Sequence, residues 1–291
     1  MYKKIKNKKG IDVFYTTTIS DGSLTRTIEM FGENHGEKLP KDNFFKSLLT
    51  HPELEDYLKL VEHASVFCDV SAKDIPKFQK IIKYSGSELV FLTFKIEKKD
   101  NIVCIDNRIE LGYLSALEER EVLEQIDDLL ENKAIKSNIN YIKNELLKMF
   151  EEQYIIFNEN SAYYQINMYK SIYENNMEVF QRQLNICKIM TKYTIRKLNK
   201  SEIFGIHGPT NWVILLVTLR NIITNIIKLG SITVDINIYR IISQTGGNIL
   251  LFSGTNHVMR LSSLPPFNEH GEYGDITKDT FEGYIIRANP N

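Results

Sequence analysis

The sequence predicts an α/β protein with a mostly parallel central sheet, flanking helices and a large helical insertion in the middle. Near the N-terminus, short apolar runs typical of buried strands alternate with helical patterns. The middle of the chain shows helical periodicity without a strand pattern, and strand and helix patterns return towards the C-terminus. We therefore expect residues 1–110 and 200–291 to form one domain, and residues 111–200 to form a helical insertion or cap.

The first thirty residues have the pattern of a β-hairpin. Residues 11–18 are β-branched and aromatic, and "SDGS" at 20–23 supplies the residues that a tight turn requires. Residues 24–31 then alternate between apolar and polar side chains. The alternation predicts two antiparallel strands, the second running into "FGENHGE".

Apolar spacing predicts two helices after this hairpin, one beginning at Pro40 and one following Pro52. The second helix places three apolar side chains on one face: Leu54, Leu58 and Val61. A further helix is expected over 71–84, with Pro76 in its first turn. Strands are expected at three apolar runs, which cover residues 64–70, 88–94 and 101–106.

The second half of the chain predicts mainly helices. Leucine and isoleucine recur at helical spacing from Leu114 to Phe150, and residues 160–200 have few breakers. The apolar segment 211–229 predicts a helix that stops at Gly230. A second helix is expected over 234–244, although the first half of this segment also fits a strand. A strand over 248–252 and a short helix, stopped by "SSLPPF", follow.

Composition limits the class of protein. The chain of 291 residues has 36 basic and 37 acidic side chains, and this balance argues against a dedicated nucleic-acid binder. The basic start "MYKKIKNKKG" is not followed by an apolar segment, so no secretory signal is expected and the cytoplasm is the predicted location. The abundance of Ile, Asn and Lys indicates an AT-rich genome, as in large DNA viruses, parasites or low-GC bacteria. For a viral protein the host cytoplasm or the virion is the expected location.

The most apolar stretch, residues 212–228, is interrupted by Arg220 and Asn221, and then by Thr224 and Asn225. It therefore lacks the roughly 18 uninterrupted apolar residues of a membrane span, and predicts a buried core helix. The 3 cysteines show no CxxC spacing, which indicates reduced side chains in a reducing compartment.

Two tetrapeptides share a GxxH pattern, and each follows a predicted strand: Gly32-Glu-Asn-His35 and Gly254-Thr-Asn-His257. A glycine at a strand end allows a tight turn or a close neighbour. The histidine three residues later then reaches the crevice at the carboxyl ends of the strands, where open α/β sheets bind ligands. Alternatively, each histidine caps a helix or donates to a backbone carbonyl.

Charged residues at other strand ends extend this candidate site. Glu33 has the chemistry of a general base or a carboxylate ligand beside His35. Arg108 follows the strand at 101–106, where a guanidinium can bind a substrate carboxylate or stabilise an oxyanion. The alternative for Arg108 is a salt bridge with Asp106 or Glu110.

Two further residues are weaker candidates. Asp69, in "FCDVS", ends a predicted strand and is either a ligand or a helix cap. His207, in "GIHGPTNW", lies either in a loop that contacts substrate or at an ordinary helix start.

Two imidazoles and one or two carboxylates in one crevice suit a divalent transition metal with an open coordination position. His35, His257 and Asp69 are the expected ligands, and Mn, Co, Zn or Fe the expected ions. A second interpretation needs no metal: histidine and glutamate act as acid and base, and Arg108 as the electrophile.

Taken together, "GENHG", the arginine after a middle strand and the late "GTNH" resemble the TIKI/TraB superfamily, including its erythromycin esterase-like and ChaN-like branches. In that group a first strand ends in a GxxH motif, a second strand carries an acidic residue, a middle strand carries an arginine, and a final GxxH follows the last core strand. The matching positions here are Gly32, Glu33 and His35, then Asp69, Arg108, Gly254 and His257. Asp69 stands where many members have glutamate.

The resemblance implies a metal-dependent hydrolase that cleaves a peptide or ester bond in a small-molecule or peptide substrate. The alternative is a catalytically inactive scaffold or host-interaction protein that retains the enzyme fold and binds through its helical middle. A nucleic-acid enzyme ranks last, because the chain lacks a basic excess.

Overall fold

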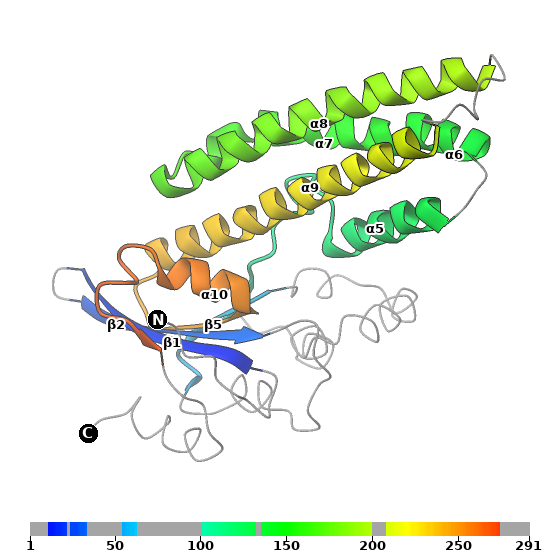
Figure 1. The fold of residues 1–291 in the computed structure, drawn as a ribbon. Coiled ribbons are helices and arrows are strands. Elements are labelled where there is room, and N and C mark those ends of the chain that lie inside the picture. The colour runs from blue at the N-terminus through cyan, green and yellow to red at the C-terminus, as the bar shows by residue number, and fades with distance from the viewer. Residues whose placement is uncertain are drawn as a thin grey trace. The chain divides into compact units, whose positions relative to one another are not determined.

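The computed structural model describes residues 11–21, 24–33, 54–62, 101–131, 135–199 and 208–273 (Figure 1). The chain divides into two compact units. The first comprises Met1–Asn107 and Asn237–Asn291, and the second comprises Arg108–Ile236. The second unit contains the predicted insertion 111–200 and continues beyond it, to residue 236.

The first unit is built on one mixed sheet with the strand order β4-β3-β5-β2-β1-β6. Its strands have the following bounds: β1 Ile11–Asp21, β2 Leu24–Glu33, β3 Leu58–Val61, β4 Ile102–Cys104, β5 Ile249–Gly254 and β6 Glu272–Tyr273. Strands β4, β3, β5 and β2 run parallel, whereas β1 pairs antiparallel with β2 and with β6. The predicted hairpin and the predicted α/β character are therefore present, in a sheet that is parallel only in its middle and on one side.

Strand β5 is the central strand, with parallel partners on both sides and six buried residues. The run Ile249-Leu-Leu-Phe252 is apolar throughout, as is typical of a strand covered on both faces. On one face the rings of Phe31 and Phe252 stack at 5.3 Å. Helix α10 (Thr255–Ser262) packs on β1 and β2.

The predicted helix over Leu54, Leu58 and Val61 is wrong, because residues 58–61 form strand β3. The apolar spacing fits a helical period, but the segment pairs with β5 on one side and β4 on the other. These two ladders satisfy backbone groups that a helix would satisfy internally. The helices predicted from Pro40 and over 71–84, and the strands over 64–70 and 88–94, lie outside the described residues.

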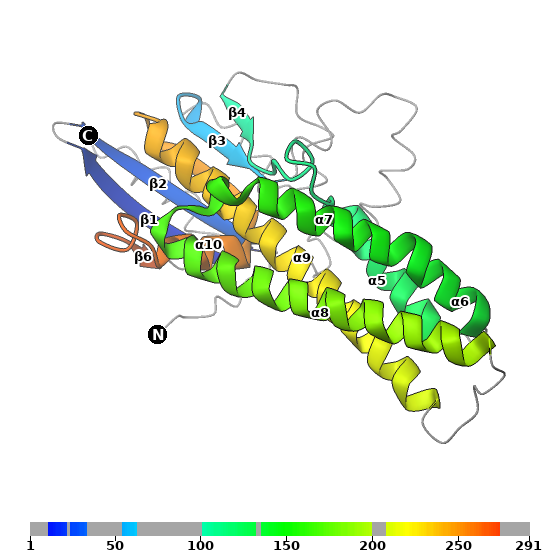
Figure 2. The same ribbon diagram turned by 90° about the horizontal axis from the view of Figure 1, so that it is seen from above.

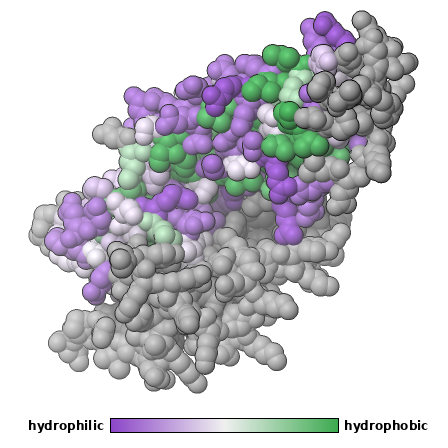
Figure 3. Space-filling model, viewed as in Figure 1, coloured by the Kyte–Doolittle hydropathy of each residue, from purple (hydrophilic) through white to green (hydrophobic). Residues whose placement is uncertain are grey.

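The second unit is helical (Figure 2). Its elements are α5 (Ala116–Glu131), α6 (Ile135–Tyr141), the π-helical turn η2 (Ile142–Leu146), α7 (Leu147–Glu159), the short η3 (Ser161–Tyr164), α8 (Asn167–Asn199) and α9 (Gly208–Gln244) up to Ile236. Helical periodicity predicted the helical character of residues 111–200 correctly. Figure 3 shows hydrophobic patches among the hydrophilic residues of these helices.

The prediction that a helix stops at Gly230 is wrong, because α9 runs without a break from Gly208 to Gln244. A Cβ atom at residue 230 would lie 3.1 Å from Arg108 Cδ and 3.3 Å from Glu119 Oε1. Glycine at this position therefore allows two buried side chains to pack against the helix. The helix continues because glycine lowers helix stability by only about 1 kcal/mol, which tertiary packing easily offsets.

Helix α9 is long and apolar enough over Asn211–Gln244 to cross a membrane, by length and composition only. Core helices of compact proteins share both properties. Of the most apolar window of this helix, 56% is buried inside the structure. Along α9, the side chains of Leu215, Leu219 and Ile222 are fully buried. This burial is what the sequence led us to expect of a core helix.

A tyrosine cluster forms part of the core of the second unit. The buried Tyr164 hydroxyl lies 2.6 Å from Thr233 Oγ1 and 3.1 Å from the Tyr113 hydroxyl. The Tyr164 ring stacks on Tyr173 at 4.3 Å, and Tyr113 stacks on Phe157 at 4.2 Å. Burial raises the pKa of Tyr113 to about 12 and raises the pKa of Tyr164 as well, so both phenols stay protonated.

We expect Tyr164→Phe to lower the free energy of unfolding by about 1–3 kcal/mol, because buried partners of the lost hydroxyl go unsatisfied. Chemical denaturation measures the loss. Tyr154→Phe is the matched control, since the Tyr154 ring packs edge-on against Phe180 and that contact survives the change. Equal losses for the two substitutions would mean that the hydrogen bonds of the Tyr164 hydroxyl do not stabilise the fold.

Glu29 is a buried carboxyl group in the middle of β2, with 6% of its surface exposed. Its Oε2 atom has no hydrogen-bond partner in the part of the chain that the structure describes. Burial raises its pKa to about 8 from an ordinary value of 4.5. The folded protein therefore holds this carboxyl group protonated at a pH where the unfolded chain has already lost the proton.

We expect the free energy of unfolding to fall as pH rises from about 4.5 to about 8, because unfolding then releases the Glu29 proton. Below this window both states are protonated, and above it the loss is constant. Glu29→Gln removes this titrating group, so the free energy of unfolding of the variant should rise relative to that of the wild type across the window. Denaturation at several pH values measures the difference. The exposed Glu269→Gln is the control; a parallel pH profile for wild type and Glu29→Gln would refute the expectation.

Candidate functional site

The carboxyl ends of three neighbouring strands meet at one edge of the sheet. In the parallel pair β2–β5, Gly32 lies opposite Ser253 and Glu33 lies opposite Gly254. The two GxxH motifs therefore begin within one residue of each other at the same edge. On the other side of β5, β3 ends at Val61, opposite Phe252, and the Glu62 N–H donates to the Phe252 carbonyl at 2.9 Å.

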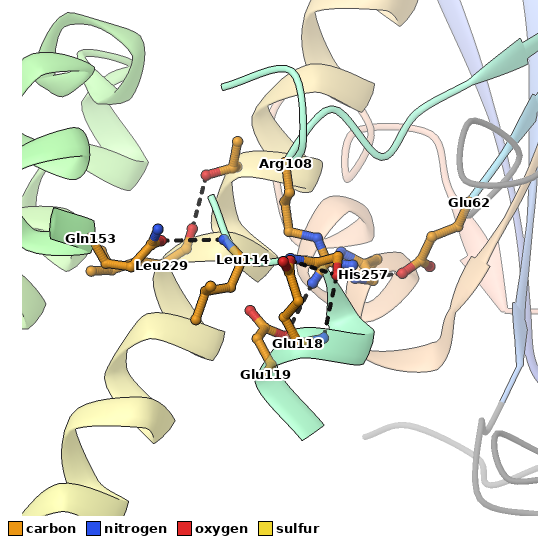
Figure 4. A network of polar contacts seen from close by, with 10 residues as sticks. Glu62, Arg108, Leu114, Glu118, Glu119, Gln153, Leu229 and His257 are labelled. Carbon is orange, nitrogen blue, oxygen red and sulfur yellow. Dashed lines mark hydrogen bonds and ion pairs between the residues drawn. The ribbon is translucent and has the colours of Figure 1, made fainter. Parts of the chain in front are cut away.

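Glu62 is the acidic residue that this edge brings to the second motif (Figure 4). Its Oε2 atom accepts the Ser253 hydroxyl at 2.6 Å and the Gly254 backbone N–H at 2.7 Å. Its Oε1 atom lies 3.4 Å from Nε2 of His257. The side chain is almost fully buried. Hydroxyl and N–H donors directed at both oxygens suit an ionised carboxylate, which only accepts hydrogen bonds.

His257 reaches Glu62 because helix α10 starts directly after strand β5. Gly254 is both the last residue of β5 and the N-cap of α10, with φ −60° and ψ 146°. No loop separates the strand from the helix, so His257 lies in the first helical turn. Its side chain is buried, with 7% of the residue exposed. The glycine therefore acts in a strand-to-helix junction, and a positive φ is not needed.

The ring of His257 has a defined tautomer. A guanidinium nitrogen of Arg260, one helical turn away, lies 3.2 Å from Nδ1. A guanidinium group can only donate hydrogen bonds, so Nδ1 must accept. The proton of the neutral ring is therefore on Nε2, facing the Glu62 carboxylate. When one ring N–H donates a hydrogen bond to a carboxylate, the other ring nitrogen keeps the lone pair that can accept a proton. Histidines in acid–base catalysis use this arrangement.

Both ring nitrogens of His257 have partners in this geometry. A metal ligand must offer a lone pair to the ion, and the Nδ1 lone pair receives an Arg260 N–H while Nε2 carries the proton. Among the described residues no three His, Cys, Asp or Glu side chains form a group that could hold a metal ion. A metal bound through His257 would require Arg260 or Glu62 to release the ring. The predicted Mn, Co, Zn or Fe site remains a prediction.

The structure places only some of the predicted site residues. Gly32 and Gly254 end adjacent strands, and the backbone of Glu33 ends β2. His257 contacts an acidic residue, Glu62. The remaining predicted residues, His35, Asp69 and His207, lie outside the described part of the chain.

Arg108 is the first residue of the second unit, and there it forms a buried ion pair. Its Nη1 atom lies 3.3 Å from Glu119 Oε2, with about 7% and 6% of the two side chains exposed. The structure shows this ion pair with Glu119, and a salt bridge with Asp106 or Glu110, the alternative for Arg108, stays a prediction. Helix α5 supplies this acid, and close packing against Gly230 encloses the pair. A role for Arg108 in substrate binding remains a prediction.

No sequence motif pointed to Glu62, Ser253 or Arg260. Glu62 was missed because "LKLV" was assigned to a helix, in which the following glutamate has no special place. Read as a strand, the same segment ends in an acid immediately after its last apolar residue, which is the signal applied to Asp69. Arg260 follows His257 at i,i+3, a spacing that puts two side chains side by side on a helix.

We expect nitrogen chemical shifts of His257 above neutral pH to show the proton on Nε2. Arg260→Met removes the donor to Nδ1 while keeping a long side chain, so the Nδ1–H tautomer should become populated. Arg240→Met, in the last turns of α9, is the control and should leave the spectrum of His257 unchanged. A ring protonated on Nδ1 in the wild type would contradict the assignment.

Neither a family model nor a curated protein nor a solved structure gives a significant match to this chain. The description of the site therefore rests on the residues and their geometry.

Proposed function

We propose that this protein is a hydrolase that cleaves an ester or peptide bond, with His257 as the acid–base group and Glu62 as the residue that positions it. The observation that supports the proposal is the buried Glu62–His257 pair at the edge where strands β3, β5 and β2 end. Ligands of open α/β sheets bind at this edge. A histidine held by a carboxylate at such a position suits proton transfer better than a structural role, which would not require a buried charge.

The resemblance to the TIKI/TraB superfamily supports the same reaction class. In that group a second strand carries an acidic residue, which is glutamate in many members. Glu62 follows β3 and contacts the histidine of the last GxxH motif, so it satisfies this position better than Asp69. The resemblance implies an ester or peptide substrate and does not choose between the branches of the superfamily.

The chemistry follows from the positions of the ring atoms. Glu62 holds the Nε2–H of His257, so Nδ1 is the atom that accepts a proton from a water molecule. The water oxygen then attacks the carbonyl carbon of the substrate, and the carbonyl oxygen takes the negative charge. The Nδ1–H proton passes to the leaving oxygen or nitrogen as the carbon–heteroatom bond breaks.

Arg260 has two roles in this scheme. Without substrate its guanidinium donates a hydrogen bond to Nδ1 of His257. The Arg260 side chain is partly exposed, so it is able to move towards a bound ligand. Next to the carbonyl oxygen it would stabilise the developing oxyanion. The predicted roles of His35 as a second imidazole, of Glu33 as a base and of Arg108 as a substrate anchor stay part of the proposal, as do Asp69 and His207.

The substrate that we propose is a small molecule or peptide, and the expected location is the cytoplasm. An inactive scaffold is the competing function, with the helical unit as its binding surface. The two differ in whether the purified protein hydrolyses any member of a panel of activated esters and short peptides.

We expect His257→Gln and Glu62→Gln each to lower the hydrolytic kcat/KM by about 10²–10⁴, the range for loss of general acid–base catalysis. Asn256→Ala changes the exposed neighbour of His257 on the same helix and is the control. Circular dichroism verifies that each variant folds. A panel without any turnover, or a His257→Gln variant with wild-type activity, would overturn the proposal in favour of the scaffold.

Metal removal separates the two catalytic interpretations. If His257 and Glu62 act by proton transfer alone, dialysis against a chelator should leave kcat unchanged within about twofold, whereas a metal-bound water would be lost. Metal analysis of the same sample identifies any ion that remains. Activity that is lost on chelation and restored by Mn, Co, Zn or Fe would instead support the predicted metal centre.

A further inference from the structure

A basic groove runs between two antiparallel segments of the helical unit. One wall is formed by η2 and α7, and the other by the C-terminal half of α8. The cavity has a volume of about 450 Å³, and its lining includes five cationic side chains: Lys143, Lys148, Lys188, Lys192 and Arg196. Glu151 is the one carboxylate in the lining. All of these residues belong to the second unit, so the groove does not depend on the first.

Most of this positive charge is not balanced within the described part of the chain. Lys188 pairs with Glu151 at 2.7 Å, and Lys148 with Glu152 at 3.8 Å. No described carboxylate lies within ion-pair distance of Lys143, Lys192 or Arg196. Like charges gathered in a concave surface raise its electrostatic potential and concentrate anions there. Repulsion between these cations destabilises the fold, so the stability of the protein does not explain the cluster.

A second, independent observation comes from the floor of the groove. Thr191 lines the cavity with only 2% of its surface exposed, and its hydroxyl has no hydrogen-bond partner in the described structure. Other threonines in α8 and α9 donate to the carbonyl four residues earlier: Thr194, Thr218, Thr224 and Thr233. Thr191 does not make this bond, so its hydroxyl is kept available as a donor. Buried hydroxyls without partners are rare and destabilising.

The π-helical turn supports the same conclusion. Helices α6 and α7 are joined through η2, which carries Lys143. Single π-helical turns within α-helices are uncommon and are found frequently at functional sites, because they redirect side chains. From residue 143 to residue 151 the wall extends about 12 Å, at 1.5 Å per residue. Cations on both walls along this length favour a ligand with several linked negative charges over a single small ion.

We propose that this groove binds a phosphate-bearing ligand with two or more linked phosphate groups, through Lys143, Lys192, Arg196 and the hydroxyl of Thr191. Lysine serves as a point charge for phosphate and arginine as a bidentate partner. The threonine hydroxyl donates a hydrogen bond from the floor. The site is independent of the proposed hydrolase site and carries no reaction. The phosphate groups belong either to a soluble molecule or to a lipid headgroup, and these sources share the same chemistry.

Inorganic tripolyphosphate is the probe, and calorimetric titration of the full chain at low ionic strength is the measurement. We expect saturable binding that weakens as salt is added. Lys192→Glu should weaken the binding about tenfold or more, because it replaces an attractive charge with a repulsive one. Lys170→Glu changes an exposed lysine of the same helix outside the groove and should leave the affinity unchanged.

Thr191→Val tests the hydroxyl without changing the charge. Loss of one hydrogen bond should weaken tripolyphosphate binding about two- to tenfold. The melting temperature should stay the same or rise, since the variant removes a buried hydroxyl that has no partner. A purely structural hydroxyl would give the opposite result, with a lower melting temperature and unchanged affinity.

Sulfate and vesicles complete the experiment. Sulfate at equal ionic strength should compete poorly with tripolyphosphate, and equal affinity for sulfate would mean an adventitious ion only, which overturns the proposal.

Vesicles of phosphatidylcholine with and without phosphatidylinositol bisphosphate distinguish a lipid headgroup from a soluble ligand. Retention on the phosphoinositide vesicles that Lys192→Glu abolishes assigns a headgroup, and tripolyphosphate binding alone assigns a soluble ligand. Absence of both, or wild-type binding by Lys192→Glu, refutes the groove as a phosphate site.

Discussion

The parallel pairing of β2 with β5 is the constraint on which the first unit depends. It joins the N-terminal hairpin to a strand near the end of the chain, in the register that sets Gly32 opposite Ser253. A shift of one residue would turn every side chain of β5 to the other face of the sheet. Ser253 would then face away from Glu62, and α10 would start on the wrong side. Because β5 is buried on both faces, such a shift would leave its apolar side chains buried but would change the neighbours against which each one packs.

The Glu62–His257 pair shows how backbone position and side-chain chemistry are combined. The carboxylate is fixed by a hydroxyl and by the N–H of Gly254, a backbone group at the strand-to-helix junction. The same junction sets the position of His257, so both partners are positioned by one short segment. Glu62 therefore has a structural role as well as its proposed catalytic role. Removal of one partner of a buried pair typically costs about 3–5 kcal/mol, and a comparison of isosteric variants is needed to separate the two roles.

The helical unit places its charges in two opposite ways. Arg108 and Glu119 are buried together, next to a glycine that leaves room for them, and their charges are balanced. In the groove of the same unit, by contrast, three of the five cations have no carboxylate partner among the described residues, and the hydroxyl of Thr191 has no hydrogen-bond partner there either. The buried ion pair neutralises its own charges and stabilises the fold, whereas clustered cations without carboxylate partners are available to bind an anionic ligand. This contrast explains why the proposed binding site is at the groove and not at the buried pair.

The sequence by itself determined the features that depend on neighbours in the chain. Periodicity and turn residues predict the β-hairpin, the helices of the middle region and a strand at 248–252, with a GxxH motif at the end of each of two strands. These patterns are local, because a helix or a tight turn satisfies its backbone groups within a few residues. Of the candidate site, His257 and the two glycines were identified from the sequence, whereas Glu62 was not.

Only the tertiary structure decided which carboxylate meets His257. The segment before Glu62 fits a helical period, and it becomes strand β3 because two distant strands offer backbone partners on both sides. Likewise, the sequence predicts a helix end at Gly230, whereas in the structure Arg108 and Glu119 occupy the space beside this glycine within a continuous helix. In both places contacts between residues far apart in the chain outweigh a weak local preference, and a single sequence does not encode such contacts in any periodic pattern.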